Sequence, residues 1–386
     1  MIQTFVAHTR EIDDCEVAIQ EVLAQLPPVD ELRANTVGIL TCHYDFIYSG
    51  MVEALQAVLP YTILGSVTSA QATPEVVNTL LLTLMVLTSD DVVFRTSCSE
   101  TLLEAPGAAV EAAYAAAALP NEKPALILPF AAFLPQNSGD EYVAVLSEAS
   151  GRAPIFGTLS IDDTATFEHA LMMYEGKGYR DKMAMLLMYG DVHPKFYIAT
   201  LSKDKIIDRP SLITKSSGHV LEEVNGRPIA EFFAQLGLTE ASEKQYAMSS
   251  IAFMIDYNDG APLVSKVFVL MNEEQQGVFA GAMPEGSTMY MALIDKEDVL
   301  LTTGQAIDEA KAAWQNASGV LAFSCVTRYL SMGGDVLAEL TLAKDRFGKA
   351  LPFMLANSGG EICPTQVDDT AAINRFHNNS AIICVF

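Results

Sequence analysis

The feature that most constrains the fold of this chain is an outline of strand, loop, helix and strand that recurs along it. Residues 36–68 start with the apolar run TVGILT and end with YTILGSVT, and residues 124–160 run in the same way from PALILP to APIFGTLS. Residues 320–358 follow the outline a third time, from VLAFSC to PFMLANS. Short β-rich runs that alternate with helical stretches predict βαβ-like units. We therefore expect an α/β (or α+β) fold with internally duplicated units, in which helices cover mixed β-sheets.

The second strands of the first two units end alike, at Gly65-Ser66 and at Gly157-Thr158. A glycine at a strand end lets the backbone approach a ligand closely, so these positions are candidate contacts. The plainer alternative is that each glycine only ends a strand at a turn. Both interpretations stay open at the level of the sequence.

The first residues predict a strand at Thr4–His8 followed by an amphipathic helix. Thr9 or Asp13 is the expected cap, because apolar residues then recur at helical spacing as far as Leu26. Pro27-Pro28 should stop the helix, since proline cannot continue the backbone hydrogen-bond pattern.

The length of 386 residues predicts two or three domains. Residues 195–215 contain few long apolar runs and include the polar stretch LSKDKIIDRPSLITK. We place the boundary there, near residue 212. This gives an N-terminal domain of residues 1–212 and a C-terminal domain of residues 213–386.

The charge of the chain excludes two classes of partner. It carries 23 basic and 48 acidic side chains, which gives a net charge of −25. Such a field repels the phosphates of nucleic acids and the headgroups of anionic membranes. We therefore expect no nucleic-acid partner and no membrane insertion.

The cysteines and the N-terminus indicate a cytoplasmic protein. The six cysteines include no CxxC pair, which is typical of reduced thiols. The first residues lack the basic start and apolar run of a signal peptide. Residues 79–88 (TLLLTLMVLT) are too short to cross a bilayer as a helix, and we expect a buried strand there.

The standard catalytic signatures are missing from this sequence. It contains no GxSxG, HExxH, GxxxxGK[ST] or strand-linked GxGxxG pattern. The six histidines lack metal-ligand spacing, so we expect neither a metal nor a cofactor. An enzyme that pairs Cys325 with His377 across the fold stays open as an alternative, because spatial proximity is not visible in the sequence.

The strand predicted at residues 320–325 brings Cys325 and Arg328 to its C-terminal end, where ligands of α/β sheets tend to bind. An arginine there can hold a carboxylate through two parallel hydrogen bonds. The alternative is that Arg328 caps a helix C-terminus or pairs with a surface acid.

Two further stretches place polar residues beside apolar strands. Glu361 follows the strand at residues 352–358 and is expected in a turn, while His377 and Asn378 lead into the terminal strand at residues 381–386. Together these side chains offer donors and acceptors to a ligand that carries both charges. The alternative is that they are turn residues bonded to the local backbone.

Four stretches of the C-terminal half resemble the successive motifs of the FIST C-terminal domain. They are VLEEVNGRP (220–228), with a tight turn at Asn225-Gly226, VLAFSCVTRYL (320–330), SGGEI (358–362) and NRFHNNS (374–380). The strand ends at Gly65 and Gly157 resemble the FIST N-terminal domain. The family usually has threonine where this chain has Ser380, and the segment between Arg328 and the GE turn is short.

The resemblance implies a sensory protein of signal transduction that binds a small molecule, with amino acids as candidates. It extends a ligand role to Cys325, Arg328, Glu361, His377 and Asn378, and it assigns no catalytic residue. No kinase, cyclase or methyl-accepting segment is fused to the sequence, so we expect a separate downstream signalling protein. Two alternatives remain: an enzyme with a spatially assembled Cys/His or Glu/His site, and a protein-interaction scaffold with an exposed apolar patch.

Overall fold

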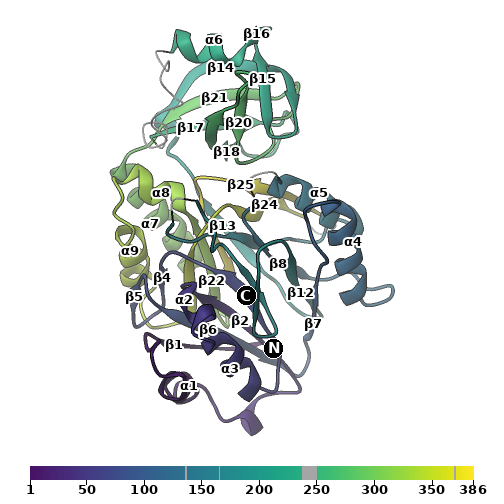
Figure 1. The fold of residues 1–386 in the computed structure, drawn as a ribbon, viewed down its shortest axis with the longest axis vertical. Coiled ribbons are helices and arrows are strands. Elements are labelled where there is room, and N and C mark those ends of the chain that lie inside the picture. The colour runs from purple at the N-terminus through teal and green to yellow at the C-terminus, as the bar shows by residue number, and fades with distance from the viewer. Residues whose placement is uncertain (135–136, 165, 237–249, 369–370) are drawn as a thin grey trace.

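The structure, a computed structural model, combines a large body with a smaller β-rich module above it (Figure 1). It describes residues 1–134, 137–164, 166–236, 250–368 and 371–386. The strands form mixed sheets that pair in both directions, and helices cover their outer faces. This arrangement confirms the expected α+β architecture.

Three units of the body share one strand order, which confirms the predicted repeat. Each unit has two parallel strands joined through a helical connection, and the first of these also pairs with an antiparallel strand that lies next to an edge strand. In the order edge, antiparallel, first parallel and second parallel, the strands of the first unit are β1 (Gln3–Thr9), β6 (Leu82–Ser89), β2 (Asn35–Cys42) and β3 (Ile63–Val67). Those of the second unit are β7 (Val93–Cys98), β12 (Met183–Tyr189), β8 (Leu126–Ala132) and β9 (Gly157–Ser160). Those of the third unit are β13 (Lys195–Ala199), β26 (Ala381–Val385), β22 (Val320–Cys325) and β23 (Phe353–Ser358).

The units are interlocked, because each contributes a hairpin to the sheet of another unit. The hairpin of the first unit pairs with β23, that of the second with β3 and that of the third with β9. These hairpins are β4 (Gln71–Ala72) with β5 (Val77–Asn78), β10 (Met172–Tyr174) with β11 (Lys177–Tyr179), and β24 (Glu361–Val367) with β25 (Ala372–His377). Both halves of the chain therefore build the body. The predicted boundary at residue 212 falls within the long strand β14 and stays a prediction.

The core of the body lies where the inner faces of the three sheets meet. The ring of Phe323 contacts those of Phe130 and Phe156 from another unit, with centroids 6.2 and 5.7 Å apart. The outer faces are covered by three groups of helices that lie on three sides of the body (Figure 1). They are α1 (Cys15–Leu23), α2 (Asp45–Tyr48) and α3 (Met51–Val58), then α4 (Pro106–Ala117) and α5 (Gly139–Ala149), and finally α7 (Lys296–Ala312) and α9 (Ala338–Phe347).

The β module comprises the described residues between 206 and 293 and has its own aromatic core. The rings of Phe233 and Phe268 lie 5.0 Å apart, and those of Phe253 and Phe279 lie 5.2 Å apart. Its elements are β14 (Ile206–Ser217), β15 (Val220–Val224), β16 (Arg227–Pro228), α6 (Ile229–Gln235), β17 (Ile251–Asp256), β18 (Val264–Lys266), β19 (Phe268–Met271), β20 (Gly277–Phe279) and β21 (Thr288–Leu293).

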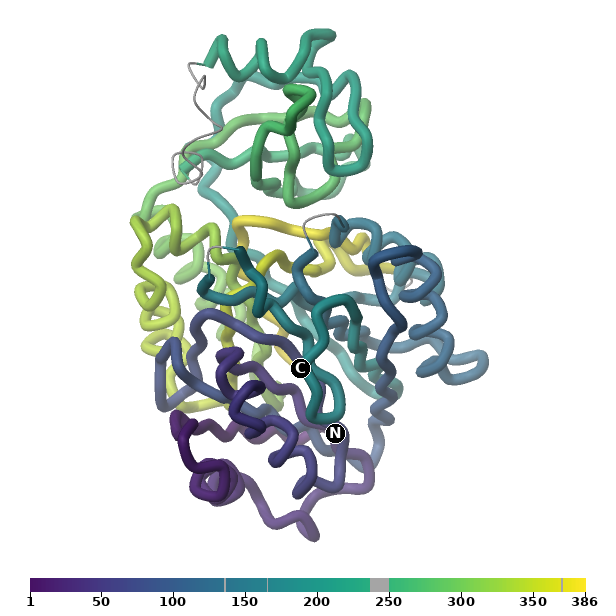
Figure 2. The backbone as a smooth tube through the Cα atoms, in the orientation of Figure 1, coloured from purple at the N-terminus to yellow at the C-terminus, as the bar shows by residue number. Residues whose placement is uncertain are grey.

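The module packs on the body above β25, the yellow segment that runs directly beneath it in Figure 2. Within the module, Asn225 and Gly226 join β15 to β16 with φ angles of 55° and 72°. Both angles are positive, as a two-residue hairpin turn requires. The tight turn predicted at this dipeptide is therefore confirmed.

The first helix differs from the prediction at both ends. Thr9 is the last residue of β1, and the cap is Asp14, whose carboxylate accepts the backbone N–H groups of Glu16 and Val17. The helix ends at Leu23. Ala24 still bonds four positions back, to Gln20, but Gln25 and Leu26 bond only three positions back.

Candidate functional site

Arg328 was expected at the end of β22, but it lies in the short helix α8 (Val326–Ser331) and is completely buried. Its Nε donates to a carboxylate oxygen of Glu339 at 2.8 Å. Its Nη2 donates to the hydroxyl of Thr303 at 2.7 Å and to the carbonyl of Val299 at 3.1 Å. The partner acid is therefore a buried residue, and not the surface acid that the alternative interpretation expected.

Both carboxylate oxygens of Glu339 are engaged. The hydroxyl of Ser324 donates to one at 2.6 Å, and the hydroxyl of Thr303 donates to the other. A buried ion pair is tolerated when hydrogen bonds satisfy its remaining donors and acceptors, and this pair meets that condition. Each nitrogen of Arg328 has a protein partner, with Nη1 bonded to the carbonyl of Thr200 at 3.3 Å. A ligand can reach this guanidinium only by displacing a partner, and its ligand role stays a prediction.

Glu361 was expected in a turn, but it is the first residue of β24. The turn is made by Gly359 and Gly360, and Gly360 has a φ of 151°. A side chain at Gly360 would start 2.4 Å from the ring of Phe376. Only glycine fits this position, because any larger residue would collide with that ring.

The carboxyl group of Glu361 is enclosed by small polar groups. The hydroxyls of Ser358 and Ser380 donate to its two oxygens at 2.6 and 2.7 Å. Burial raises the pKa of Glu361 to about 8, while these hydroxyls, the Arg328 guanidinium and the Cys325 thiol hold it lower. Burial and, to a lesser extent, the charge of Glu361 raise the pKa of Cys325. The site therefore holds a protonated thiol beside a carboxyl group that titrates near neutral pH.

His377 lies directly opposite Glu361 in the antiparallel pair of β24 and β25. Its Nε2 is 3.1 Å from the carbonyl oxygen of Cys363, so Nε2 carries the proton and donates it. Burial lowers the pKa of His377 to about 4, which leaves the imidazole neutral at neutral pH. Its Nδ1 is thus a buried acceptor, and it has no partner among the described residues.

Unpaired polar atoms gather at the end of β25, where the body meets the β module. Asn378 is 1% exposed, and neither its Oδ1 nor its Nδ2 has a partner among the residues that the structure describes. The Oδ1 of Asn379 and the Oγ of Ser265 are unpaired in the same sense. The backbone N–H of Asn378 donates to the carbonyl of Ser265 at 3.1 Å, so the two segments are in direct contact. We call His377, Asn378, Asn379 and Ser265 the seam cluster.

A buried ion pair holds the module to the body next to the seam cluster. The Nζ of Lys266 in β18 is fully buried and lies 3.0 and 2.9 Å from the two carboxylate oxygens of Asp140 in α5. It also donates to the carbonyl of Phe376 at 2.8 Å. Burial lowers the pKa of Lys266, and Asp140 opposes this effect.

A second cation crosses the same seam. Arg375 of β25 pairs with Asp259 of the module, and its guanidinium lies 4.3 Å from the centre of the Tyr257 ring. The hydroxyl of Tyr257 is buried without a partner among the described residues. The contact between module and body is therefore polar, which is typical of interfaces whose two sides can move relative to one another.

The structure brings the sequence-predicted residues into one buried region. Glu361 contacts Cys325 and faces His377, Asn378 follows His377, and Arg328 reaches the carbonyl of Asn379. None of the five faces bulk water, since Cys325 is 2% exposed, Arg328 and Glu361 are 0% exposed, and His377 and Asn378 are 1% exposed. Their ligand roles stay predictions.

Three residues of this region were missed by the sequence analysis. Glu339 and Ser265 carry no local signal, because each is defined by a contact with a distant segment. Lys266 could have been noticed, since it is a lone cation in the apolar run LVSKVFVL. Lysine is almost never fully buried unless it is paired, so such a position demands a buried acid.

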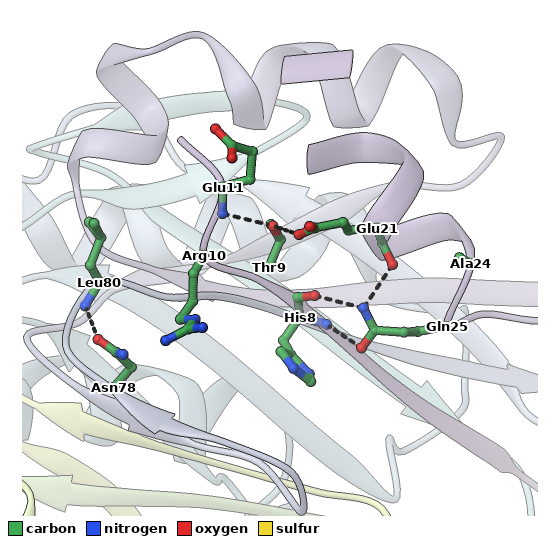
Figure 3. Close-up of a pocket in the computed structure, with 9 residues that line it drawn as sticks. All are labelled: His8, Thr9, Arg10, Glu11, Glu21, Ala24, Gln25, Asn78 and Leu80. Carbon is green, nitrogen blue, oxygen red and sulfur yellow. Dashed lines mark hydrogen bonds between the residues drawn. The ribbon is translucent and has the colours of Figure 1, made fainter. Parts of the chain in front are cut away.

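A small void and an open groove are among the hollows in the part of the chain that the structure describes. One is a void of about 10 Å³ against Glu339, Ser324 and Thr303, which has room for about one water molecule. The other is an open groove of about 850 Å³ beside β1 and α1 (Figure 3), which lie at the end of the body opposite to the β module in Figure 1. In the described part of the chain, no helix is long and apolar enough to cross a membrane, and no group of three or more His, Cys, Asp or Glu side chains could hold a metal ion.

Comparisons with known proteins identify two family matches. The family model of the FIST N domain matches residues 36–227, and that of the FIST C domain matches residues 230–364. No curated protein matches significantly. Similar solved structures include a cyanuric acid hydrolase from A. caulinodans, with 11% identity, a TM-score of 0.36 and coverage of 100% of this chain and 99% of that one. PurLQS from Thermotoga maritima has 9% identity, a TM-score of 0.20 and coverage of 100% and 72%. Similarities this low support no statement about activity.

Proposed function

Because this chain belongs to the FIST family, whose domains are small-ligand sensory domains of signalling, we propose that it senses a small zwitterion such as an amino acid. The proposed binding site is the seam cluster. The observation that carries the proposal is Asn378, a buried amide with a donor and an acceptor that both lack partners in the described structure. Buried polar groups are nearly always hydrogen-bonded, so such a group calls for a partner.

The seam cluster suits a molecule that carries both charges. The Nδ1 of His377 and the oxygens of Asn378 and Asn379 can accept hydrogen bonds from an ammonium group, while the Nδ2 of Asn378 can donate to a carboxylate. An unsatisfied buried group costs about 1–3 kcal/mol, and a ligand that supplies its partner recovers this free energy. The neutral His377 favours this use, since a protonated imidazole would repel the ammonium.

Entry of a ligand requires the β module to move away from β25. The contacts across the seam are ion pairs and hydrogen bonds, which water can replace when the seam opens. A ligand that binds the closed arrangement more tightly than the open one shifts the population toward closure. We propose that a downstream signalling protein reads the position of the module.

The enzyme alternative receives less support from the geometry. A nucleophilic cysteine needs a lowered pKa, whereas burial raises that of Cys325. The nitrogen of His377 that carries the proton is bonded to the carbonyl of Cys363, and the hydroxyl of Thr327 lies 3.1 Å from the Cys325 sulfur. The favoured function is therefore ligand sensing without covalent chemistry.

The proposal is tested by thermal unfolding in the presence of each of the twenty amino acids at millimolar concentration. A ligand present at about 100 times its dissociation constant stabilises a protein by roughly 2.7 kcal/mol. We expect at least one amino acid to raise the melting temperature. Asn378→Ala should lose this response, while Asn316→Ala, a change at an exposed asparagine in a turn, should keep it.

The unliganded Asn378→Ala protein gives a second readout. Because the side chain of Asn378 makes no hydrogen bond to a described residue, its removal should leave the melting temperature unchanged or raise it. A purely structural asparagine would lower it. A flat response of the wild-type protein to the whole panel would contradict the proposal and favour the interaction scaffold.

A further inference from the structure

A groove of about 850 Å³ lies between the end of β1, the end of α1 and the strand β5 (Figure 3). Its wall is held by Gln25, whose side-chain amide pairs with the backbone of His8 as a neighbouring strand would. The Nε2 of Gln25 donates to the carbonyl of His8 at 2.7 Å, and the N–H of His8 donates to the Oε1 of Gln25 at 3.2 Å. These two bonds hold the side chain of Gln25 against the backbone of His8.

Two basic side chains, those of His8 and Arg10, lie on one side of this groove (Figure 3). β1 ends at Thr9, so Arg10 and Glu11 follow directly after the strand, and all four residues from His8 to Glu11 line the groove. Figure 3 shows the side chains of His8 and Arg10 both extending downward in the view, opposite to that of Glu11. The Oδ1 of Asn78 accepts the N–H of Leu80 at 3.0 Å, which leaves its Nδ2 directed toward Arg10.

Two acids, Glu11 and Glu21, line the groove, and both accept hydrogen bonds from nearby groups. A carboxylate oxygen of Glu21 accepts the hydroxyl of Thr9 at 2.5 Å, and Glu11 accepts the backbone N–H groups of Asp13 and Asp14 at 2.9 and 3.0 Å. Figure 3 shows the side chain of Glu11 pointing away from His8 and Arg10.

The third nearby acid is Glu75, which lies 2.6 Å from the ammonium group of Lys349. Arg10, by contrast, forms no ion pair with a described residue. Arg10 shares the groove with the imidazole of His8 and the side-chain amide of Asn78. These three groups share one property, which is that each can donate a hydrogen bond to an anion.

We propose that this groove is a second ligand site, separate from the seam cluster, which binds a small organic carboxylate. The carboxylate pairs with the guanidinium of Arg10, whose planar fork matches its two oxygens. The Nδ2 of Asn78 and the imidazole of His8 complete the anion site. The apolar part of the ligand lies against Leu80 and Ala24, which line the same groove.

The test uses succinate as the probe, titrated into the full-length protein at constant ionic strength and followed by calorimetry and by the imidazole NMR signals of the histidines. A site with a dissociation constant near 1 mM should be close to saturated at about 10 mM succinate. We expect the signals of His8 to shift. Arg10→Gln should weaken binding at least about tenfold, since it removes the charge of the bidentate donor.

Two control variants make the outcome decisive. Arg209→Gln removes one positive charge from an exposed site in the β module and should leave succinate binding unchanged. Asn378→Ala should also leave it unchanged, because the seam cluster is a different site. The proposal is overturned if succinate does not bind at about 10 mM, if Arg10→Gln binds as the wild type does, if Arg209→Gln weakens binding equally, or if Asn378→Ala abolishes it.

Discussion

Replacing Glu361 by glutamine should remove a large part of the pH dependence of stability near neutral pH. The folded-state pKa of Glu361 is about 8, against a reference value of 4.5. Between these two pH values the folded protein retains a proton that the unfolded chain has released. The contribution of Glu361 to the free energy of unfolding is therefore fully present below about pH 4.5, and it is lost as the pH rises to 8.

The size of the effect follows from this window. Each pH unit in which the two states differ by one proton corresponds to about 1.4 kcal/mol. Over the full window the free energy of unfolding then changes by roughly 5 kcal/mol. In the part above the reference pKa of histidine, from pH 6.5 to 8, it changes by roughly 2 kcal/mol. That part is the more informative, because His377 is neutral in the folded protein there and loses its remaining proton in the unfolded chain as the pH rises above 6.5.

The assay is urea unfolding of the wild-type and Glu361→Gln proteins at a series of pH values. The glutamine resembles the protonated carboxyl group, and the hydroxyls of Ser358 and Ser380 can rotate to serve it. The difference between the two free energies of unfolding should move in favour of the variant by roughly 2 kcal/mol between pH 6.5 and 8.

Other titrating groups cancel in that difference, including His377, whose lowered pKa reduces stability as the pH falls below 6.5. Glu111→Gln, at an exposed position of α4, should show no change with pH relative to the wild type. Parallel profiles for Glu361→Gln and the wild type would refute the reasoning, because they would mean that Glu361 is ionised in the folded protein at neutral pH.

Two further outcomes concern stability and are measured by urea unfolding at a single pH. Arg328→Met should lower the free energy of unfolding by about 3–5 kcal/mol, because it leaves the carboxylate of Glu339 buried without its cation. The double variant with Glu339→Leu should recover most of this loss. A double variant as unstable as the single one would contradict this explanation. Gly65→Ala should destabilise strongly, since the new methyl group would lie 1.8 Å from the carbonyl oxygen of Leu40. Its control, Gly107→Ala in α4, meets no atom closer than 3.5 Å and should change stability by less than about 1 kcal/mol; equal effects of the two alanines would contradict the packing argument.

Much of the local structure could be predicted from the sequence, because local structure depends on short-range patterns. The alternation of apolar runs located the strands of the three units, and the Asn225-Gly226 pair located a turn that requires positive φ angles. The order of the C-terminal motifs identified the family. Errors were small shifts at element ends, as at Asp14 and Glu361, where one hydrogen bond or one glycine decides the boundary.

The tertiary structure alone decided how the units interlock and which residues meet in the buried region. The hairpin exchange joins segments from opposite halves of the chain, as β4 pairs with β23. Lys266 and Asp140 are 126 positions apart, and their contact exists only because the module packs on α5. Apolar periodicity records which face of an element is buried but not which element covers it. The partners of Arg328 and Lys266 were therefore fixed by the packing of distant segments, since a buried charge takes whichever acid that packing brings within reach.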